Sequence, residues 1–429
     1  MSRADRALVI GAGRSGLAVV RFLLARGTPV RLCDTRAAGQ LGDAVAGLGG
    51  GVELVLGGYD ESALDGCGAV YASPGVPWRA PLLEAARARG MTVSSEIDLF
   101  FSLCPAPVVG VTGTNGKTTT TAMIGAVLER GPRPVLVGGN IGDTVLDRLP
   151  EITPGHWVVL ELSSFQLESC ARPRTRIGVV LNLTPDHLDR HGTMDAYVDA
   201  KARMLEAQDP GDDAVLNGAD ERCRALASRT RARVTWFDRH LPAPTVPIPG
   251  RHNLLNALAA AAVGRLAGLD DDAIQAGLAG FRGVEHRLQL VGEWGGVRWY
   301  NDSKATNPDA GLVALTSFPD TPVVLIAGGY GSGFDLDEWE AAVRRHTHAA
   351  VLIGRSAPEL ERRLAGHPVR RAASLDDAIE TAARLVPERG VVLLSPAYKS
   401  YDMFQSYEDR GRRFVAAVHA HHAHAGANR

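Results

Sequence analysis

The sequence is poor in cysteine, has no long apolar run and carries almost no excess charge. Its five cysteines lack a C-x-x-C spacing, and their odd number rules out a complete set of disulfides. No apolar run reaches the roughly 18 residues that span a bilayer. Residues 1–6 are charged and lead directly into the apolar residues 7–10, which is not the pattern of a signal peptide. With a formal net charge of −2 and no polybasic segment, we expect a cytoplasmic protein without a nucleic-acid or membrane partner.

The composition is that of a globular protein, with 45% hydrophobic and 22% charged residues over 429 positions. Short apolar runs followed by glycine-rich turns and helical patterns recur along the chain, which predicts an α/β fold. The predicted strands are residues 7–10, 30–33, 108–111, 158–160, 178–183, 297–300, 323–327, 350–353 and 391–394. The proline-containing stretch 104–107 indicates a linker, and a second boundary is expected near Gly283. We therefore predict three domains, residues 1–104, 105–283 and 284–429.

The first glycine-rich turn, residues 11–16, has the pattern G-x-G-x-x-G, and Asp34 ends the next predicted strand. Such glycines let the backbone approach a ligand, the following helix attracts phosphate, and the carboxylate can hold ribose hydroxyls. Taken alone, this turn favours a nicotinamide-dependent oxidoreductase. A tight strand–helix turn without a ligand is the alternative.

The second turn, residues 110–119, contains Gly-Lys-Thr after a predicted strand and is the stronger signal. Its backbone N–H groups can bind phosphates, Lys117 can meet the terminal phosphate charge, and the Thr118 hydroxyl can bind Mg²⁺. The spacing is a variant of the usual P-loop, since residue 111 is valine where a glycine is standard. Glu161 ends the predicted strand 158–160, where a metal-binding acid belongs.

Together with these turns, a series of motifs extends over most of the chain. They are GTNGKTT (113–119), GGNIG (138–142), LELSSFQLE (160–168), NLTPDHLDRHG (182–192), GRHN (250–253), EHR (285–287), NDSKATN (301–307) and SPA (395–397). Their order resembles the Mur ligases of bacterial peptidoglycan synthesis, and among them the glutamate-adding branch. The resemblance implies a Rossmann-like N-terminal domain, a P-loop-type central ATPase domain and a Rossmann-like C-terminal domain. It also implies a monomeric, ADP-forming ligase that uses ATP and Mg²⁺ to join glutamate to UDP-N-acetylmuramoyl-L-alanine through an acyl phosphate.

The resemblance assigns a ligand to each group of site residues. The UDP-sugar residues are Ser15, Asp34, Thr35, Arg36, Ser73, Gly75, Asn140, Ser163 and Gln166. The ATP residues are Gly113, Thr114, Asn115, Gly116, Lys117, Thr118, Thr119, Asn253, Arg287, Asp302 and Lys304. The glutamate residues are Thr306, Lys399, Ser400 and Tyr407.

Four residues are implied as metal ligands: Thr118, Glu161, His187 and Lys201, the last as a carbamate. Lys117, Glu161, His187 and Lys201 are the expected catalytic residues. Without the resemblance, His187 reads as a structural histidine and Lys201 as an exposed helical lysine.

The departures from the family pattern gather at the amino-acid site. In the turn 328–333, Ser332 stands where the family has a basic residue, while Lys399 is an unusual cation beside Ser400. We therefore expect a narrow preference for L-glutamate, with Lys399 binding its side-chain carboxylate. D-glutamate, the usual substrate of the family, is the alternative.

Three other functions compete with this interpretation. A nicotinamide-dependent oxidoreductase would leave the residues 113–119 unexplained, and a non-catalytic nucleotide switch would not need Lys201, Arg287 and Lys304. A folate-adding ligase is disfavoured by the uridine-type first turn. We assign no role to the histidine-rich end of the chain, residues 419–424, which is expected to be a solvent-exposed helix.

Overall fold

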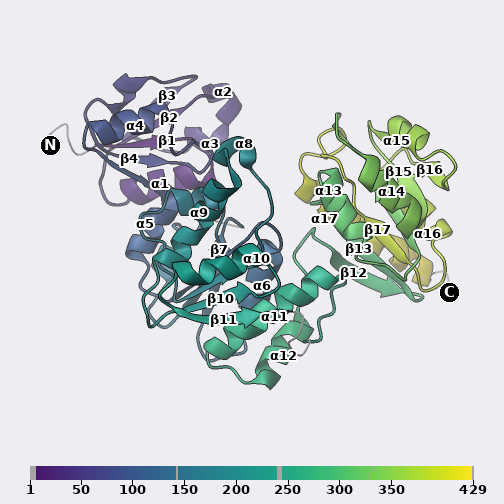
Figure 1. Ribbon diagram of the computed structural model, residues 1–429. Helices are drawn as coiled ribbons and strands as arrows, with labels where there is room; N and C mark the ends of the chain where they lie inside the picture. Colours follow the sequence, from purple (N-terminus) through teal and green to yellow (C-terminus); the bar gives the residue numbers. More distant parts are fainter. Residues whose placement is uncertain (1–5, 142–143, 239–243, 332, 428–429) are drawn as a thin grey trace. The chain divides into compact units, whose positions relative to one another are not determined.

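The computed structural model describes residues 6–141, 144–238, 244–331 and 333–427 (Figure 1). The chain forms two compact units, residues 1–244 with 255–278 and residues 245–254 with 279–429. Each unit is described by itself. Within the described ranges, no helix combines the length and the apolar character needed to cross a membrane.

The first sheet is parallel, with strand order β3-β2-β1-β4-β5. Its strands are β1 Arg6–Ile10, β2 Val30–Asp34, β3 Val52–Leu56, β4 Cys67–Ala72 and β5 Thr92–Ser95. The helices are α1 Arg14–Leu24, α2 Ala38–Leu41, α3 Asp43–Ala46, α4 Pro81–Ala88 and α5 Glu96–Leu103. Chain order reverses at β1, which lies between β2 and β4, and doubly wound sheets bind ligands at the carboxyl ends of such strands.

The second sheet is also parallel, with order β11-β10-β9-β6-β8-β7. Its strands are β6 Val108–Thr112, β7 Val135–Gly139, β8 Trp157–Glu161, β9 Ile177–Val180, β10 Asp213–Asn217 and β11 Arg233–Phe237. The helices of this region are α6 Lys117–Leu128, α7 Ser164–Glu168, α8 Leu188–His191, α9 Met194–Glu206, α10 Glu221–Ala225, α11 Arg251–Leu266 and α12 Asp271–Gly280. Every residue of β6 is buried, because a central parallel strand is covered on both faces.

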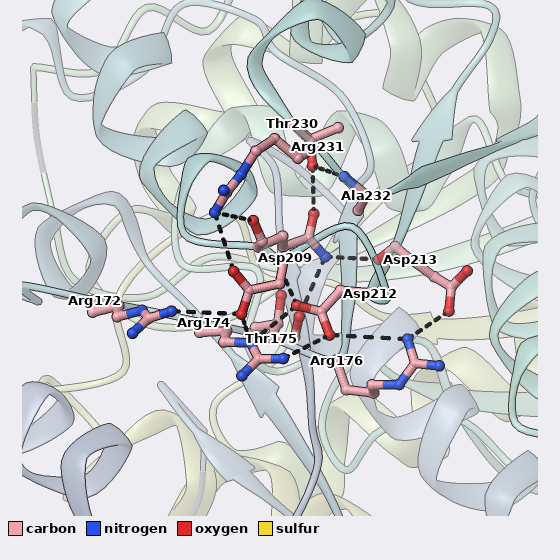
Figure 2. A network of polar contacts seen from close by, with 11 residues as sticks. Arg172, Arg174, Thr175, Arg176, Asp209, Asp212, Asp213, Thr230, Arg231 and Ala232 are labelled. Carbon is pink, nitrogen blue, oxygen red and sulfur yellow. Dashed lines mark hydrogen bonds and ion pairs between the residues drawn. The ribbon is translucent and has the colours of Figure 1, made fainter.

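An ion-pair network stabilises the amino ends of β9 and β10 (Figure 2). Arg174 Nε donates to Asp212 Oδ2 at 3.0 Å, and Arg176 Nη1 donates to Asp213 Oδ2 at 2.7 Å. Both carboxylates are almost fully buried, and each is paired with two arginines, Asp212 with Arg174 and Arg176 and Asp213 with Arg176 and Arg233, which compensates the buried charges. In a parallel sheet the amino ends lie opposite the carboxyl end of β6, where the P-loop begins. The network therefore lies at the end of the sheet away from the P-loop.

The third sheet has order β12-β13-β17-β14-β15-β16 and is parallel except for the antiparallel pair β12–β13. Its strands are β12 Gln289–Trp294, β13 Val297–Asn301, β14 Val323–Ala327, β15 Thr347–Leu352, β16 Val369–Arg371 and β17 Val391–Leu394. The helices are α13 Pro308–Leu315, α14 Asp337–His346, α15 Ala357–Arg363, α16 Leu375–Leu385 and α17 Tyr407–Ala427. The central strands β14 and β17 are buried throughout.

The predicted α/β class is confirmed, and the predicted strands correspond to observed ones with small differences at their ends. The predicted strand 178–183 is too long, since β9 ends at Val180. Beyond it, the Asn182 carbonyl oxygen accepts the N–H of Thr114 at 2.9 Å, so this segment holds the P-loop instead of continuing the sheet.

Candidate active site

A cavity of about 420 Å³ lies at the carboxyl ends of β1, β2 and β4. Its lining includes six of the nine residues predicted for the UDP-sugar: Ser15, Asp34, Thr35, Arg36, Ser73 and Gly75, which would face the uridine. Arg14 and Tyr59, which the sequence motifs did not single out, line it as well. The turn requires its last glycine, because a Cβ on Gly16 would lie 1.8 Å from the carbonyl oxygen of Gly11.

The buried carboxylate of Asp34 is fully engaged by protein donors. Its oxygens accept the N–H of Ala12 at 2.7 Å, and the backbone N–H, Nε and Nη2 of Arg36 at 2.8, 2.9 and 2.7 Å. The hydrogen bonds from the Arg36 side chain are the largest cause that holds the pKa of Asp34 well below its usual range. Asp34 therefore orients Arg36 and the glycine turn, in contrast to the direct hold on ribose hydroxyls that the motif alone suggested.

The P-loop connects β6 to α6. Gly113 and Gly116 have φ angles of +148° and +86°, which side-chain-bearing residues rarely adopt. Lys117 begins α6, and its Nζ donates to the carbonyl oxygens of Gly113 at 3.0 Å and Thr114 at 2.8 Å. Thr118 and Thr119 are buried in the first turn of the helix.

Residues without a predicted role hold this loop in place. Asn115 N–H donates to Asn182 Oδ1 at 2.8 Å, and Asn182 Nδ2 donates to the Asn115 carbonyl oxygen at 2.9 Å. The hydroxyls of Thr114 and Tyr197 are 3.1 Å apart. Asn182 lies inside the NLTPDHLDRHG motif, so the motif contained a signal for it, whereas Tyr197 gave none.

Glu161 ends β8 next to β6, where its backbone pairs with Val111. Its Oε1 accepts Asn140 Nδ2 at 3.0 Å, while its buried Oε2 has no hydrogen-bond partner. A buried carboxylate oxygen without a donor suits a hard cation such as Mg²⁺. In the described part of the chain, no group of three His, Cys, Asp or Glu side chains could hold a metal by itself. A cation beside Glu161 therefore needs further ligands of another kind.

Lys201, on α9, is only 1% exposed and does not fit the exposed helical lysine that its local sequence suggested. Its Nζ donates to the Gly113 carbonyl oxygen at 2.9 Å and to Thr112 Oγ1 at 3.3 Å. Burial lowers the pKa of the Lys201 amine to about 7, and the charge of Lys117 acts in the same direction. A substantial fraction of the amine is thus neutral at neutral pH.

The loop that carries His187 lies close to α7. His187 is half-exposed, has a left-handed φ of 53°, and its ring centroid lies 5.0 Å from that of Phe165. Ser163 caps α7, and its hydroxyl donates to Gln166 Oε1 at 3.0 Å. Gln166 is buried. Its side chain therefore stabilises this turn, in addition to its predicted role toward the sugar.

The second unit carries the other residues predicted for ATP. Asp302 follows β13, and its carboxylate accepts Leu288 N–H at 3.1 Å and Ser395 Oγ at 2.7 Å. Burial raises the pKa of Asp302 to about 7. Arg287 has a buried Nε without a hydrogen-bond partner, and the Lys304 N–H donates to the His286 carbonyl oxygen. Asn253 lies in the first turn of α11 and is also part of this unit.

Three of the predicted glutamate residues follow β17 in the sequence, and Thr306 lies between β13 and α13. Lys399 is exposed and pairs with Tyr330 through two backbone hydrogen bonds, of 2.7 and 3.1 Å. Ser400 is buried, Thr306 is half-buried and Tyr407 begins α17. Ser332, on which the expected handedness partly depends, lies outside the described residues.

A buried arginine that the motifs did not indicate organises this region. Arg410, on α17, donates to Ser303 Oγ at 2.9 Å and to the Tyr398 carbonyl oxygen at 3.1 Å. It therefore ties the NDSKATN loop to the segment that carries Lys399 and Ser400.

Within each unit, the predicted residues come together at the carboxyl ends of parallel strands. The first unit gathers the P-loop, Asn140, Glu161, Ser163, Gln166, His187 and Lys201. The second gathers Arg287, Asp302, Lys304, Thr306, Lys399, Ser400 and Tyr407.

Comparisons with known proteins agree with this arrangement. Three family models match in succession: the Mur ligase MurD-like N-terminal domain over residues 5–95, the Mur ligase middle domain over 111–243, and the Mur ligase glutamate ligase domain over 286–398. A UDP-N-acetylmuramoylalanine–D-glutamate ligase of Pelotomaculum thermopropionicum is 42% identical over 445 residues, covering 96% of this chain and 97% of the relative. The chain belongs to the Mur ligase family.

Other relatives of this Mur ligase extend the match. A ligase of the same name from Symbiobacterium thermophilum is 41% identical over 449 residues, covering 97% and 98% of the two chains. Solved structures share the fold: MurC of Thermotoga maritima has a TM-score of 0.60 at 20% identity, over 97% of this chain and 99% of that one. MurF of Acinetobacter baumannii also has a TM-score of 0.60, at 17% identity, over 96% and 93%.

The family determines the type of reaction. This Mur ligase is an ATP-dependent, ADP-forming enzyme of peptidoglycan synthesis that joins an acid to an amino acid. The resemblance to the glutamate-adding branch of the Mur ligases, which the motifs indicated, is confirmed. The two alternative functions, a nicotinamide-dependent oxidoreductase and a non-catalytic nucleotide switch, do not agree with this family.

Proposed function

We propose that this Mur ligase adds glutamate to UDP-N-acetylmuramoyl-L-alanine. The relatives that match along almost the whole chain carry this substrate in their names. The observation that carries the proposal is the pair of Glu161 and Lys201 beside the P-loop. One supplies a buried carboxylate oxygen without a donor, and the other a buried amine with a lowered pKa. A nucleotide switch has no need of either group.

In this proposal each of the three predicted domains binds a different substrate. Residues 1–104 bind the UDP-sugar, 105–283 bind ATP and 284–429 bind the amino acid. The cavity lined by Ser15, Asp34 and Arg36 supports the first assignment, and the P-loop supports the second. Small-molecule substrates, a monomeric state and a cytoplasmic location belong to the same proposal.

The reaction has two steps. An oxygen of the substrate carboxylate attacks the γ-phosphorus of ATP, so an O–P bond forms and the bond to ADP breaks. The amine of glutamate then attacks the acyl carbon, a C–N bond forms, and phosphate leaves. Both partners of the first step are anions, so Lys117 lowers their repulsion. Alignment of the two reactants contributes up to about 7–11 kcal/mol.

Mg²⁺ fits the residues at the P-loop. Glu161 offers its unpaired Oε2, and the Thr118 hydroxyl, His187 and a carbamylated Lys201 complete the proposed ligands. When bound, the metal neutralises phosphate charge during transfer. The carbamate forms when the neutral Lys201 amine attacks CO₂ and loses a proton, which replaces a buried cation with an anionic oxygen ligand.

D-glutamate is the acceptor that the relatives favour, because their names specify it. They give no support to the L-glutamate preference expected from residues 332 and 399, so the alternative replaces it as the main proposal. L-glutamate stays as a second candidate because of Lys399. Among 46 lysines and arginines the chain has only four lysines, and the other three are Lys117 and Lys304, predicted for ATP, and Lys201, predicted as a metal ligand. The presence of the fourth lysine beside Ser400 supports a role in binding a carboxylate.

The test is ADP release with UDP-N-acetylmuramoyl-L-alanine and a panel of D- and L-amino acids. We expect turnover with glutamate and not with alanine, lysine or diaminopimelate, and a higher kcat/KM for D- than for L-glutamate. Turnover with an amino acid other than glutamate would overturn the proposal. A higher kcat/KM for L-glutamate would favour the second candidate.

A further inference from the structure

Arg190 lies between two parts of the first unit that bind different substrates. It belongs to α8, directly after the loop that carries His187, yet its guanidinium reaches the loop that lines the uridine cavity. Its Nη2 donates to the carbonyl oxygens of Val76 at 2.8 Å and Pro74 at 3.3 Å, and its Nη1 to that of Gly75 at 3.4 Å. Three successive carbonyl groups of the cavity wall are thus bound by one side chain.

While its N–H groups donate to the carbonyl groups, the guanidinium also packs on an aromatic cluster. Arg190 Cζ lies 4.5 Å from the ring centroid of Phe165. Phe165 in turn stacks with His191 at 5.3 Å, and His191 Nε2 lies 2.9 Å from Ser164 Oγ. The rings therefore join α8 to the beginning of α7, close to Ser163.

The same cluster continues to the P-loop. The ring centroids of His191 and Tyr197 are 5.4 Å apart, and the Tyr197 hydroxyl contacts Thr114 at 3.1 Å. The Tyr197 ring also lies 4.6 Å from the buried Lys201 amine. A continuous series of contacts therefore joins the uridine cavity to the nucleotide loop, and Arg190 is the member that spans the two domains.

We propose that Arg190 is a positioning residue that fixes the uridine loop, residues 73–76, relative to the P-loop. Through this contact the bound UDP-sugar presents its carboxylate to ATP at the correct distance. The inference rests on the function proposed above. An arginine suits the task, because its planar guanidinium can bind several carbonyl groups and stack on a ring at the same time. A lysine offers a point charge and cannot reproduce both contacts.

The contacts also fit a purely structural role, in which Arg190 only holds the two domains together. Loss of Arg190 would then lower the stability of the protein and affect the binding of both substrates equally. A positioning role predicts a selective effect. Without Arg190 the loop keeps its local bonds, from Ser73 N–H to the Ile10 carbonyl oxygen and from Val76 N–H to the Ser73 carbonyl oxygen. The uridine cavity therefore persists, but its wall loses three hydrogen bonds, so it binds UDP more weakly and is no longer fixed relative to the P-loop.

The chain offers a matched control. Arg133 donates to the carbonyl oxygens of Pro154 and Gly155, both at 2.8 Å, and lies 4.9 Å from the ring of Trp157. It thus makes the same kinds of contact at the amino end of β8, opposite the end that carries Glu161.

The experiment compares Arg190→Ala, Arg190→Lys and Arg133→Ala in ADP release, with thermal unfolding of each variant. For Arg190→Ala we expect the KM for UDP-N-acetylmuramoyl-L-alanine to rise and kcat to fall, each by about tenfold, with the KM for ATP within about twofold of the parent. Arg190→Lys should recover a minor part of the loss. Arg133→Ala should keep the parent kinetics with a similar change in Tm.

Unchanged kinetics in Arg190→Ala would overturn the inference, as would equal losses toward both substrates that follow the fall in Tm. Calorimetric titration with UDP separates this inference from the proposed function. If the parent protein fails to turn over, but UDP binds it and Arg133→Ala equally and Arg190→Ala more weakly, only the proposed function fails. UDP affinity that is unaffected by Arg190→Ala, or absent from the parent, would contradict the role of Arg190.

Discussion

The Lys201 amine lies 2.9 Å from the carbonyl oxygen of Gly113, so a buried lysine contacts the first glycine of the GTNGKTT motif directly. Its pKa of about 7 lies below the ordinary lysine value, because burial penalises the charged form. The neutral fraction, which alone can react with CO₂, therefore increases as the pH rises through 7.

The first prediction is a carbamate on Lys201. In ¹³C-bicarbonate, the protein should give a carbamate signal in ¹³C NMR that grows as the pH rises through 7. Because the chain has only four lysines, the assignment is direct: Lys201→Ala should remove the signal and nearly all activity. Acetate or formate should partly restore activity by supplying an oxygen ligand. A carbamate signal that persists in Lys201→Ala, together with no rescue, would contradict the assignment.

The second prediction concerns Lys117. Lys117→Ala should lower ADP release by at least about 1,000-fold, because the transferred phosphoryl group loses its main cationic contact. Folding should be little affected, since the amine donates its hydrogen bonds to carbonyl groups of its own loop, which are Gly113 and Thr114. Arg130→Ala, an exposed cation beyond the other end of α6, is the control and should keep full activity. If Lys117→Ala retained a tenth of the parent rate, Lys117 would not be the main cationic contact of the transferred phosphoryl group.

The third prediction is a pH dependence of stability caused by Glu96. This buried side chain accepts Leu146 N–H at 3.1 Å, and burial raises its pKa to about 7. The unfolded value is about 4.3, so the folded protein binds more protons between these two values. Stability from this group therefore decreases as pH rises from about 4.3 to 7, by at most about 1.4 kcal/mol per pH unit, and levels off above 7.

Glu96→Gln retains a carbonyl acceptor for Leu146 and removes the titration. Its Tm should fall less steeply than that of the parent protein over this pH range. Parallel curves of Tm against pH for the two proteins would show that Glu96 is already ionised or makes no difference.

The fourth prediction addresses Lys399. If its ammonium binds a glutamate carboxylate, Lys399→Ala should lower kcat/KM for the preferred enantiomer by roughly 10- to 100-fold, the usual effect of losing one charge-assisted contact. The KM for ATP should stay the same. Lys399→Arg keeps the charge and should retain more activity than Lys399→Ala. An unchanged ratio of D- to L-glutamate kcat/KM in Lys399→Ala would exclude a role in handedness.

The glycine turns and the buried strands were predictable because each depends on local sequence. Glycines at 113 and 116 mark backbone conformations that other residues avoid, and the runs that form β14 and β17 are too apolar to lie anywhere but in a core. The end of β9 was not predictable, because the contacts of Asn182 with the P-loop are made between distant parts of the chain.

The environment of the site residues could not be derived from their types. A lysine on an amphipathic helix gives no sign that its amine is buried, as Lys201 is. Likewise Asp34 was expected to face the ligand, whereas Arg36 engages its carboxylate. The histidine-rich end was expected to extend into solvent, yet His422 stacks on Trp294 with ring centroids 4.3 Å apart. Each of these features depends on a partner that only the folded chain brings close.

The most direct test of the account follows the oxygen atoms of the substrate. UDP-N-acetylmuramoyl-L-alanine with ¹⁸O in its terminal carboxylate is incubated with ATP, Mg²⁺ and D-glutamate, and the phosphate and the product are analysed by mass spectrometry. If the carboxylate is activated as an acyl phosphate, one labelled oxygen appears in inorganic phosphate and the other remains in the new amide. Inorganic phosphate without label, or label in a released nucleotide, would contradict the account.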